Sequence, residues 1–246
     1  MSRGVYAFGD GDAPARRLAL LAEVFDPTSS EFLLREGPAA PALALDLGCG
    51  PGHSTRLIAR TLRPRRTLGL DISPDFVSRA AREAPPGATF AVHDGVGRPF
   101  PEGPVDLVYA RLLVAHLPEP EAAVAGWAAQ LAPGGAVLIE DTDAIETAEP
   151  VFVDYLAEIA ERLRARGQQL YPGRLLAGLA DSSRLAAASP TAGHAAAMFR
   201  LNLDSWCDDP GVHDRLARGL EALRGDARTG VITWRVRQAV IRQTSK

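Results

Sequence analysis

Residues 45–55 place three glycines within five positions, directly after an apolar run. The segment reads LDLGCGPGHST, and the apolar run before it begins at Ala42. The run predicts a buried strand, and the spacing of apolar residues after the glycines predicts a helix. Glycine lets a backbone approach a ligand closely, and the first N–H groups of a helix are free to bind polar groups. A strand that passes into a helix through such a turn is typical of a nucleotide-sized site in an α/β fold.

A second segment, LGLDI at residues 68–72, ends another apolar run in a carboxylate. Asp71 follows the glycines by about 20 residues, a spacing that suits a ribose-binding acid on the neighbouring strand. The glycine spacing is G-x-G-x-G, and Asp46 stands two residues before the first glycine. The dinucleotide fingerprint is G-x-G-x-x-G, so a NAD(P)-dependent oxidoreductase is a less favoured alternative.

Together, the DLGCGPG and GLDIS segments closely resemble the first two motifs of class I S-adenosylmethionine-dependent methyltransferases. The resemblance covers roughly residues 40–140. It implies S-adenosylmethionine as the cofactor and S-adenosylhomocysteine as its product. In that family the glycine turn holds the methionine part of the cofactor, and the second acid holds both ribose hydroxyls.

The resemblance also implies roles for single residues at the ends of the predicted strands. Asp46 is expected to accept a hydrogen bond from the cofactor's amino group, with ordering of the turn as the alternative role. Asp94 is expected to bind the adenine amino group. Arg111 is expected to border the methionine moiety, unless it lies on the surface. The full set expected around the cofactor is Asp46, Gly48, Cys49, Gly50, Gly52, Asp71, Ile72, Asp94, Gly95 and Arg111.

Two further residues are candidates for catalysis. A sulfonium cofactor carries an electrophilic methyl group, so the protein mainly aligns a nucleophile behind it. His116, in the segment after the fourth predicted strand, is the best candidate for a general base; fixing the next loop is its alternative role. Asp141 follows the fifth strand near the expected acceptor, and solvation in a loop is its alternative. The histidines have no zinc-like spacing, so no metal is expected.

The pattern of elements predicts an α/β fold with a doubly wound, mostly parallel seven-stranded sheet, the Rossmann-like methyltransferase fold. Predicted strands alternate with helices. The resemblance implies a closing antiparallel hairpin, for which 195–203 and 231–241 are the candidate strands. The predicted strands are 42–47, 67–72, 89–92, 105–110 and 136–140, the last one after a turn at 133–135. The predicted helices include 13–25, a second short helix after a cap at 28–31, 121–131, 151–166 and 213–224.

This pattern divides the chain into an N-terminal helical cap over residues 1–40 and a cofactor-binding domain over residues 41–246. Residues 150–230 are expected to supply helices on the substrate side. The length of 246 residues suits one large domain or a core with a small appendage.

Composition narrows the expected partners to a small molecule. The net charge of −3 gives no electrostatic case for nucleic acid. We find no apolar stretch of about 20 residues and no signal peptide, so no membrane partner and a cytoplasmic location are expected. A homodimer is left open.

The sequence therefore predicts methyl transfer to an oxygen, nitrogen or carbon atom of a small molecule. A composition rich in Ala, Arg, Gly and Pro suggests, by association, a role in secondary metabolism. A protein that keeps the fold and the cofactor but catalyses a non-methylating reaction is the main alternative, because fold does not fix function.

Overall fold

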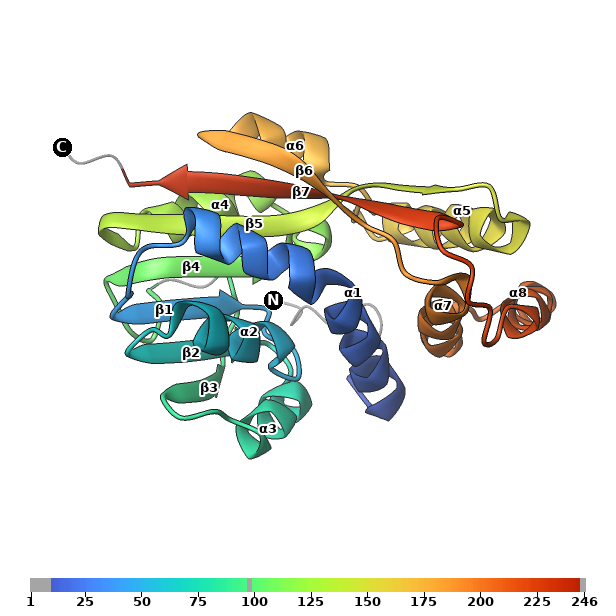
Figure 1. Ribbon diagram of the computed structural model, residues 1–246, viewed down its shortest axis with the longest axis horizontal. Helices are drawn as coiled ribbons and strands as arrows, with labels where there is room; N and C mark the ends of the chain where they lie inside the picture. The colour runs from blue at the N-terminus through green and yellow to red at the C-terminus, as the bar shows by residue number, and fades with distance from the viewer. Residues whose placement is uncertain (1–9, 97–98, 244–246) are drawn as a thin grey trace.

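The computed structural model describes residues 10–96 and 99–243 around a seven-stranded sheet (Figure 1). The strand order is β3-β2-β1-β4-β5-β7-β6. The first five strands pair in parallel, and β7 is antiparallel to both of its neighbours. This arrangement confirms the predicted mostly parallel α/β sheet. The strands are β1 (Leu43–Leu47), β2 (Arg66–Asp71), β3 (Ala88–Val92), β4 (Val105–Arg111), β5 (Leu131–Thr147), β6 (Ser182–Ala188) and β7 (Ile232–Arg242).

Helices cover both faces of the sheet. Side chains alternate between the two faces of a strand, so Leu45 and Leu47 pack in one core with α4, while Ala44 packs in another with α1 and α2. The helices are α1 (Asp12–Glu36), α2 (His53–Leu62), α3 (Pro74–Arg82), the 3-10 turn η1 (Val114–His116), α4 (Pro120–Ala128), α5 (Pro150–Ala165), α6 (Gly173–Leu179), α7 (Ala192–Trp206) and α8 (Pro210–Ala222).

The N-terminal helix α1 is continuous, so the predicted second helix with its own cap at 28–31 is wrong. Pro27 lies inside α1, where a proline removes a backbone donor and costs about 3 kcal/mol. Phe32 and Leu33 are fully buried further along. Burying such side chains contributes about 1.5–3 kcal/mol each, which offsets the proline. Ser29, expected in the cap, is also buried, and its hydroxyl accepts a hydrogen bond from Arg111 of β4.

The predicted closing hairpin is right for its last strand and wrong for its first. Residues 195–203 lie within α7, and β6 is the strand that pairs with β7. Ala195, Met198 and Leu203 are buried at helical spacing. The true edge strand β6 is mostly exposed, so it lacks the alternation of apolar and polar residues from which a half-buried strand is predicted.

The start of β5 also differs from the prediction. Helix α4 ends at Ala128, and Leu131 already pairs with Val105 of β4. The predicted turn at 133–135 is an irregularity inside β5, between the pairs that Val105 and Leu107 make. Pro133 and the two glycines after it are therefore accommodated by a register shift within the strand, as β-bulges allow.

Three helices, α5, α7 and α8, gather at one end of the long strand β7 (Figure 1). Their inward residues form one apolar cluster that also includes Phe25 of α1 and Trp234 of β7. The N-terminal helix and the C-terminal helices thus meet beside the sheet. No helix in residues 10–96 and 99–243 has the length and apolar character needed to cross a membrane. The division into a cap over 1–40 and a domain over 41–246 stays a prediction.

Candidate functional site

A cavity of about 420 Å³ lies where β1, β2 and β4 end, with Arg17, Leu18 and Leu21 of α1 on one side. Open parallel sheets bind ligands at the carboxyl ends of their strands. Most of the residues predicted around the cofactor line this cavity. They are Gly48, Cys49, Gly50, Asp71, Ile72, Asp94, Gly95 and Arg111, whereas Asp46 and Gly52 lie outside the lining.

The glycine turn after β1 needs its glycines for conformation and for space. Gly48 and Gly52 have φ values of +66° and +85°, which L side chains rarely adopt. A Cβ on Gly48 would lie 2.9 Å from Cδ1 of Leu113, and one on Gly52 would lie 3.0 Å from Cβ of Ala80. Gly52 therefore shapes the turn from behind, although it does not line the cavity.

Asp71, at the end of β2, is tied to the glycine turn by main-chain hydrogen bonds. The Gly50 amide donates to Asp71 Oδ2, and the Ser73 amide donates to Oδ1, both at 2.8 Å. Burial raises the pKa of Asp71, and these amide donors act in the opposite direction. Each carboxylate oxygen can accept more than one donor. Asp71 is thus held in place at the cavity with acceptor capacity to spare.

Asp46, at the end of β1, lies behind the turn and is fully buried. Its Oδ2 accepts hydrogen bonds from Ser54 Oγ at 2.7 Å and from Thr55 Oγ1 at 2.5 Å. Its Oδ1 has no hydrogen-bond partner within the described residues. Burial raises the pKa of Asp46 to about 6. The carboxyl group orders the start of α2, which is the alternative role considered above, and it keeps one unused acceptor oxygen.

The loop after β3 presents Asp94 and Gly95 to the cavity. The Val96 amide donates to Asp94 Oδ1 at 3.0 Å, and the Trp127 indole donates to the Gly95 carbonyl at 2.6 Å. Ile72, on the neighbouring strand end, is 37% exposed although it is apolar. These groups give one part of the cavity a flat apolar surface with polar neighbours.

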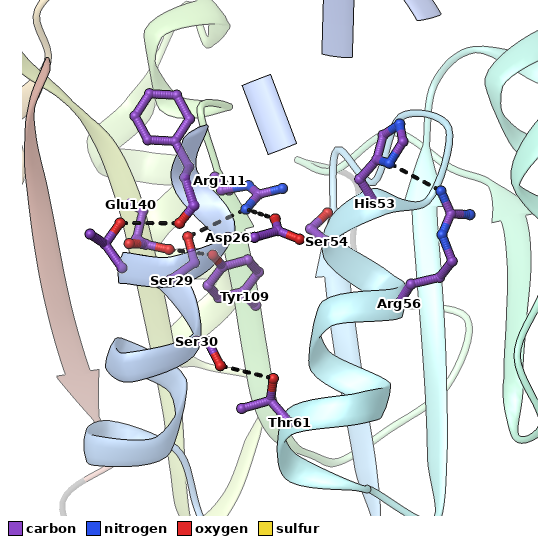
Figure 2. A network of polar contacts seen from close by, with 12 residues as sticks. Asp26, Ser29, Ser30, His53, Ser54, Arg56, Thr61, Tyr109, Arg111 and Glu140 are labelled. Atoms are coloured by element: carbon purple, nitrogen blue, oxygen red, sulfur yellow. Dashed lines mark hydrogen bonds and ion pairs between the residues drawn. The ribbon is translucent and has the colours of Figure 1, made fainter. Parts of the chain in front are cut away.

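Arg111, the last residue of β4, is not on the surface: its side chain is only 9% exposed. Its guanidinium donates to Asp26 at 2.9 Å and to Ser29 at 3.3 Å, both on α1 (Figure 2). Asp26 also pairs with Arg60 of α2. This ion pair joins the N-terminal helix to the strand ends that form the cavity. Sequence reasoning missed it, because no local pattern connects residues so far apart.

A second set of polar contacts connects α1 to the sheet beside the Asp26–Arg111 ion pair. The Tyr109 hydroxyl donates to Glu140 (Figure 2). Glu140 also accepts from the Gln238 amide at 2.7 Å, and that amide donates to the Thr28 carbonyl of α1. Strands β4, β5 and β7 are therefore connected to α1 through buried hydrogen bonds, which fix the helix above one wall of the cavity.

His116 and Asp141, the candidate catalytic residues, line a smaller cavity of about 120 Å³, and His116 lines the larger one as well. Burial and the charge of Arg17 lower the pKa of His116 to about 4, so its imidazole is neutral at pH 7. Asp141 accepts the Ala115 amide at 3.2 Å and the Thr142 amide at 2.8 Å. Burial raises its pKa to about 7. Asp141 therefore holds the 3-10 turn that carries His116.

Several lining residues of the larger cavity were not predicted. Arg17, His93 and Gln168 all line it. Arg17 gave no signal, because an arginine on an amphipathic helix usually faces solvent.

Comparison with known proteins agrees with this site. A family model described as a methyltransferase domain matches residues 44–135. A trans-aconitate 2-methyltransferase from Methylobacterium nodulans is 35% identical over 163 residues, which cover 65% of this chain and 58% of that relative. This chain therefore spans little more than half the length of that curated relative.

Solved structures share the fold at low sequence identity. A proposed methyltransferase from Bacillus halodurans has a TM-score of 0.61 at 15% identity, covering 88% of this chain and 98% of its own. A phosphoethanolamine N-methyltransferase from Haemonchus contortus, solved with S-adenosylhomocysteine, has a TM-score of 0.55 at 17% identity, covering 92% of this chain and 58% of its own. The family match and the shared fold agree with the motifs: residues 44–135 match a methyltransferase domain, and the chain resembles the class I S-adenosylmethionine-dependent methyltransferases.

Proposed function

We propose that this protein transfers the methyl group of S-adenosylmethionine to a small-molecule acceptor. The main support for the proposal is the hydrogen bond from the Gly50 amide of the glycine turn to Asp71, in the lining of the 420 Å³ cavity. Two strand ends, one supplying bare main chain and the other a carboxylate, are thereby joined by a hydrogen bond. That pairing suits a molecule with a ribose and a short polar chain.

The residues at the cavity fit the parts of this cofactor. Asp71 has acceptor capacity for two ribose hydroxyls, and Ile72 offers an apolar surface to a purine ring. Asp94 and Gly95 line the same cavity and would meet the edge of that ring. The unused Oδ1 of Asp46 is a buried acceptor behind the turn, and the ammonium group of the cofactor would supply a donor for it, directly or through water.

The protein's own contribution to the reaction is mainly positioning. The bound cofactor supplies an electrophilic methyl group, and alignment of the two reactants can lower a barrier by up to about 7–11 kcal/mol. Arg111 lines the cavity, but its charge is balanced by Asp26.

His116 would contact the acceptor, because it lines both the larger and the smaller cavity. With a pKa of about 4, its imidazole is a weak base at neutral pH. We infer that it orients the acceptor, and that Asp141 positions His116 through the main chain. The Methylobacterium nodulans relative is named for trans-aconitate, so that compound is the first acceptor to test here.

Two measurements on the purified chain test the proposal. Thermal unfolding is followed with S-adenosylhomocysteine and, in parallel, with NAD(P)H. A ligand at a hundred times its Kd stabilises the native state by about 2.7 kcal/mol, and we expect this only for S-adenosylhomocysteine. Transfer of label from methyl-labelled S-adenosylmethionine is then measured with trans-aconitate and a panel of acids, phenols and amines. Stabilisation by NAD(P)H alone would refute the proposal, and binding without transfer to any acceptor would leave only a cofactor-binding role.

A further inference from the structure

A histidine ring stands at the start of α2, in the lining of the larger cavity. His53 is the first residue of that helix and follows Gly52 of the glycine turn. Its side chain is half-buried and lines the cavity together with Ser54. The helix start has no side-chain cap and no acidic residue in its first turn. Because the first amides of a helix need acceptors, this place suits a ligand that supplies an acceptor oxygen.

Arg56 determines which nitrogen of the His53 ring carries a proton. Its Nη2 donates a hydrogen bond to His53 Nδ1 at 3.1 Å (Figure 2). An arginine can only donate, so Nδ1 must accept, and a neutral imidazole then carries its proton on Nε2. Burial, together with the charges of Arg56 and Arg111, lowers the pKa of His53 to about 4, so the ring is neutral at pH 7. The hydrogen bond therefore assigns a donor to Nε2.

This donor points away from the residue that fixes it. Arg56 is itself held, because its Nη1 donates to the Pro51 carbonyl at 3.2 Å and lies 3.5 Å from Glu83. In Figure 2 the second ring nitrogen of His53 lies on the side away from Arg56. Within residues 10–96 and 99–243, this nitrogen makes no hydrogen bond to the protein. An N–H group in the cavity lining is thus left for a bound molecule.

The groups near His53 match the two charges of an amino acid. Asp46, behind the same turn, has an Oδ1 atom without a partner in the described part of the chain, and this acceptor suits an ammonium group. Arg111 lines the same cavity, and its hydrogen bonds to Asp26 and Ser29 both use Nη1. A guanidinium has several further N–H groups, so Arg111 keeps donors while it stays paired with Asp26. Donors from His53 and Arg111 suit a carboxylate.

We propose that His53 Nε2–H donates a hydrogen bond to the carboxylate in the methionine part of the cofactor, and that Arg56 is the positioning residue that fixes this tautomer. The inference rests on the proposed function and adds a binding residue to its cofactor site. A hydrogen bond to a carboxylate is about twice as strong as one between neutral groups. The cofactor is favoured over the methyl acceptor as the source of the carboxylate, because His53 lines the larger cavity and not the smaller one.

The test compares two ligands that differ by one carboxylate. Decarboxylated S-adenosylmethionine keeps the adenosine, the sulfonium and the ammonium group of S-adenosylmethionine but lacks its carboxylate. Calorimetric titration of the full chain measures the Kd of each ligand, and thermal unfolding shows that each variant is folded. The KM for trans-aconitate, or for another acceptor that the chain methylates, is measured in parallel.

Four variants separate the donor from the ring that carries it. His53→Phe keeps a ring and removes the donor, whereas His53→Gln supplies an N–H donor on a side chain of similar reach. Arg56→Met removes the partner of Nδ1. Arg82→Met is the control for loss of an arginine, because Arg82 is exposed on α3. Nitrogen NMR of the His53 ring identifies its tautomer in the wild type and in Arg56→Met.

We expect His53→Phe to raise the Kd for S-adenosylmethionine by about tenfold to a hundredfold, as for loss of a hydrogen bond to a charged group. The Kd for the decarboxylated ligand should change little, and His53→Gln should recover most of the loss. Arg56→Met should weaken S-adenosylmethionine binding less than His53→Phe, because part of the rings keep the proton on Nε2. The NMR spectrum should show an unprotonated Nδ1 in the wild type and both tautomers in Arg56→Met. Arg82→Met should behave as the wild type.

Several results would overturn the inference while leaving methyl transfer intact. Equal weakening of both ligands in His53→Phe would mean that the ring only packs against the cofactor. An unchanged Kd for S-adenosylmethionine in folded His53→Phe, or a protonated Nδ1 in the wild type, would remove the proposed donor. A raised acceptor KM with unchanged S-adenosylmethionine binding would assign the carboxylate to the acceptor instead. Failure of the wild type to bind either ligand would refute the proposed function, and this inference with it.

Discussion

At the scale of single residues, the carboxylates at the ends of β1 and β2 differ in their burial and in their hydrogen-bond donors. Asp46 is fully buried and takes hydroxyl donors from Ser54 and Thr55. Asp71 lines the cavity and takes main-chain amides from Gly50 and Ser73. The same residue type thus organises a helix start in one place and lines a cavity in the other.

Asp71→Ala should weaken cofactor binding without unfolding the protein. Loss of a hydrogen bond to a charged group costs about 1.5–3 kcal/mol, so calorimetric titration with S-adenosylhomocysteine should show Kd raised by about tenfold to a hundredfold. Asp75→Ala is the control, because Asp75 is exposed on α3 nearby. Wild-type affinity in a folded Asp71→Ala protein would contradict the ribose role.

Asp141 makes stability depend on pH. Its pKa is raised from 3.8 to about 7 by burial. Between these values the unfolded chain has lost the proton and the native state keeps it, so stability falls as pH rises from about 4 to 7. Below pH 4 both states are protonated and the penalty is absent. Asp141→Asn cannot ionise, and it should therefore lack this loss.

The measurement is urea unfolding of both proteins at pH 4, 5.5 and 7.5. The free energy of unfolding of Asp141→Asn, relative to the wild type, should increase across this range by up to about 4 kcal/mol. The variant loses one acceptor for a main-chain amide, which shifts its curve at every pH but does not change the trend. Asp75→Asn supplies an exposed control. Parallel curves for wild type and Asp141→Asn would show that the carboxyl titrates normally.

At the scale of elements, the sequence predicted the helices and strands that depend on interactions between residues close together in the chain. The strand that ends at Asp71 was predicted from its apolar run, and Ser73 then caps α3 by accepting the Phe76 amide, which is a local interaction too. The elements that were mispredicted depend on tertiary contacts. Helix α1 runs through Pro27 because Phe32 and Leu33 are buried beyond it. Strand β6 forms because β7 offers it an edge, which its own exposed residues do not reveal.

The ion pair between Asp26 of α1 and Arg111 of β4 should contribute strongly to the stability of the protein. Asp26→Ala leaves the mostly buried Arg111 without its carboxylate. Breaking a buried pair costs about 3–5 kcal/mol, and the partial exposure of Asp26 should reduce this to about 2–3 kcal/mol. Arg60→Ala is the matched comparison, because it removes the exposed partner of the same acid and should cost less than about 1 kcal/mol. Chemical denaturation of both variants measures the difference in their free energies of unfolding. Equal losses of stability in the two variants would mean that the buried Asp26–Arg111 pair contributes no more than the exposed Asp26–Arg60 pair.

At the scale of the whole molecule, the two cavities have different origins along the chain. The larger cavity is built largely from residues within 44–135, the range that the family model matches. The smaller cavity is walled mainly by α1, α5, α7 and β7, which lie outside that range. The lining of the larger cavity was therefore predictable from motifs. The lining of the smaller cavity was not, because this cavity forms only when segments near the two ends of the chain pack together.

This division predicts that cofactor affinity and acceptor affinity can be changed separately. Leu170→Ala enlarges the smaller cavity at a half-buried position that does not line the larger cavity. It should raise the acceptor KM and leave the Kd for S-adenosylhomocysteine unchanged, while Asp71→Ala should do the reverse. Because Leu170 and Asp71 line different cavities, their effects on the free energy of the transition state should add within about 0.5 kcal/mol in the double variant. Leu34→Ala, at a position 65% exposed on α1, controls for loss of a leucine. A Leu170→Ala protein with weakened S-adenosylhomocysteine binding would show instead that the two cavities act as one site.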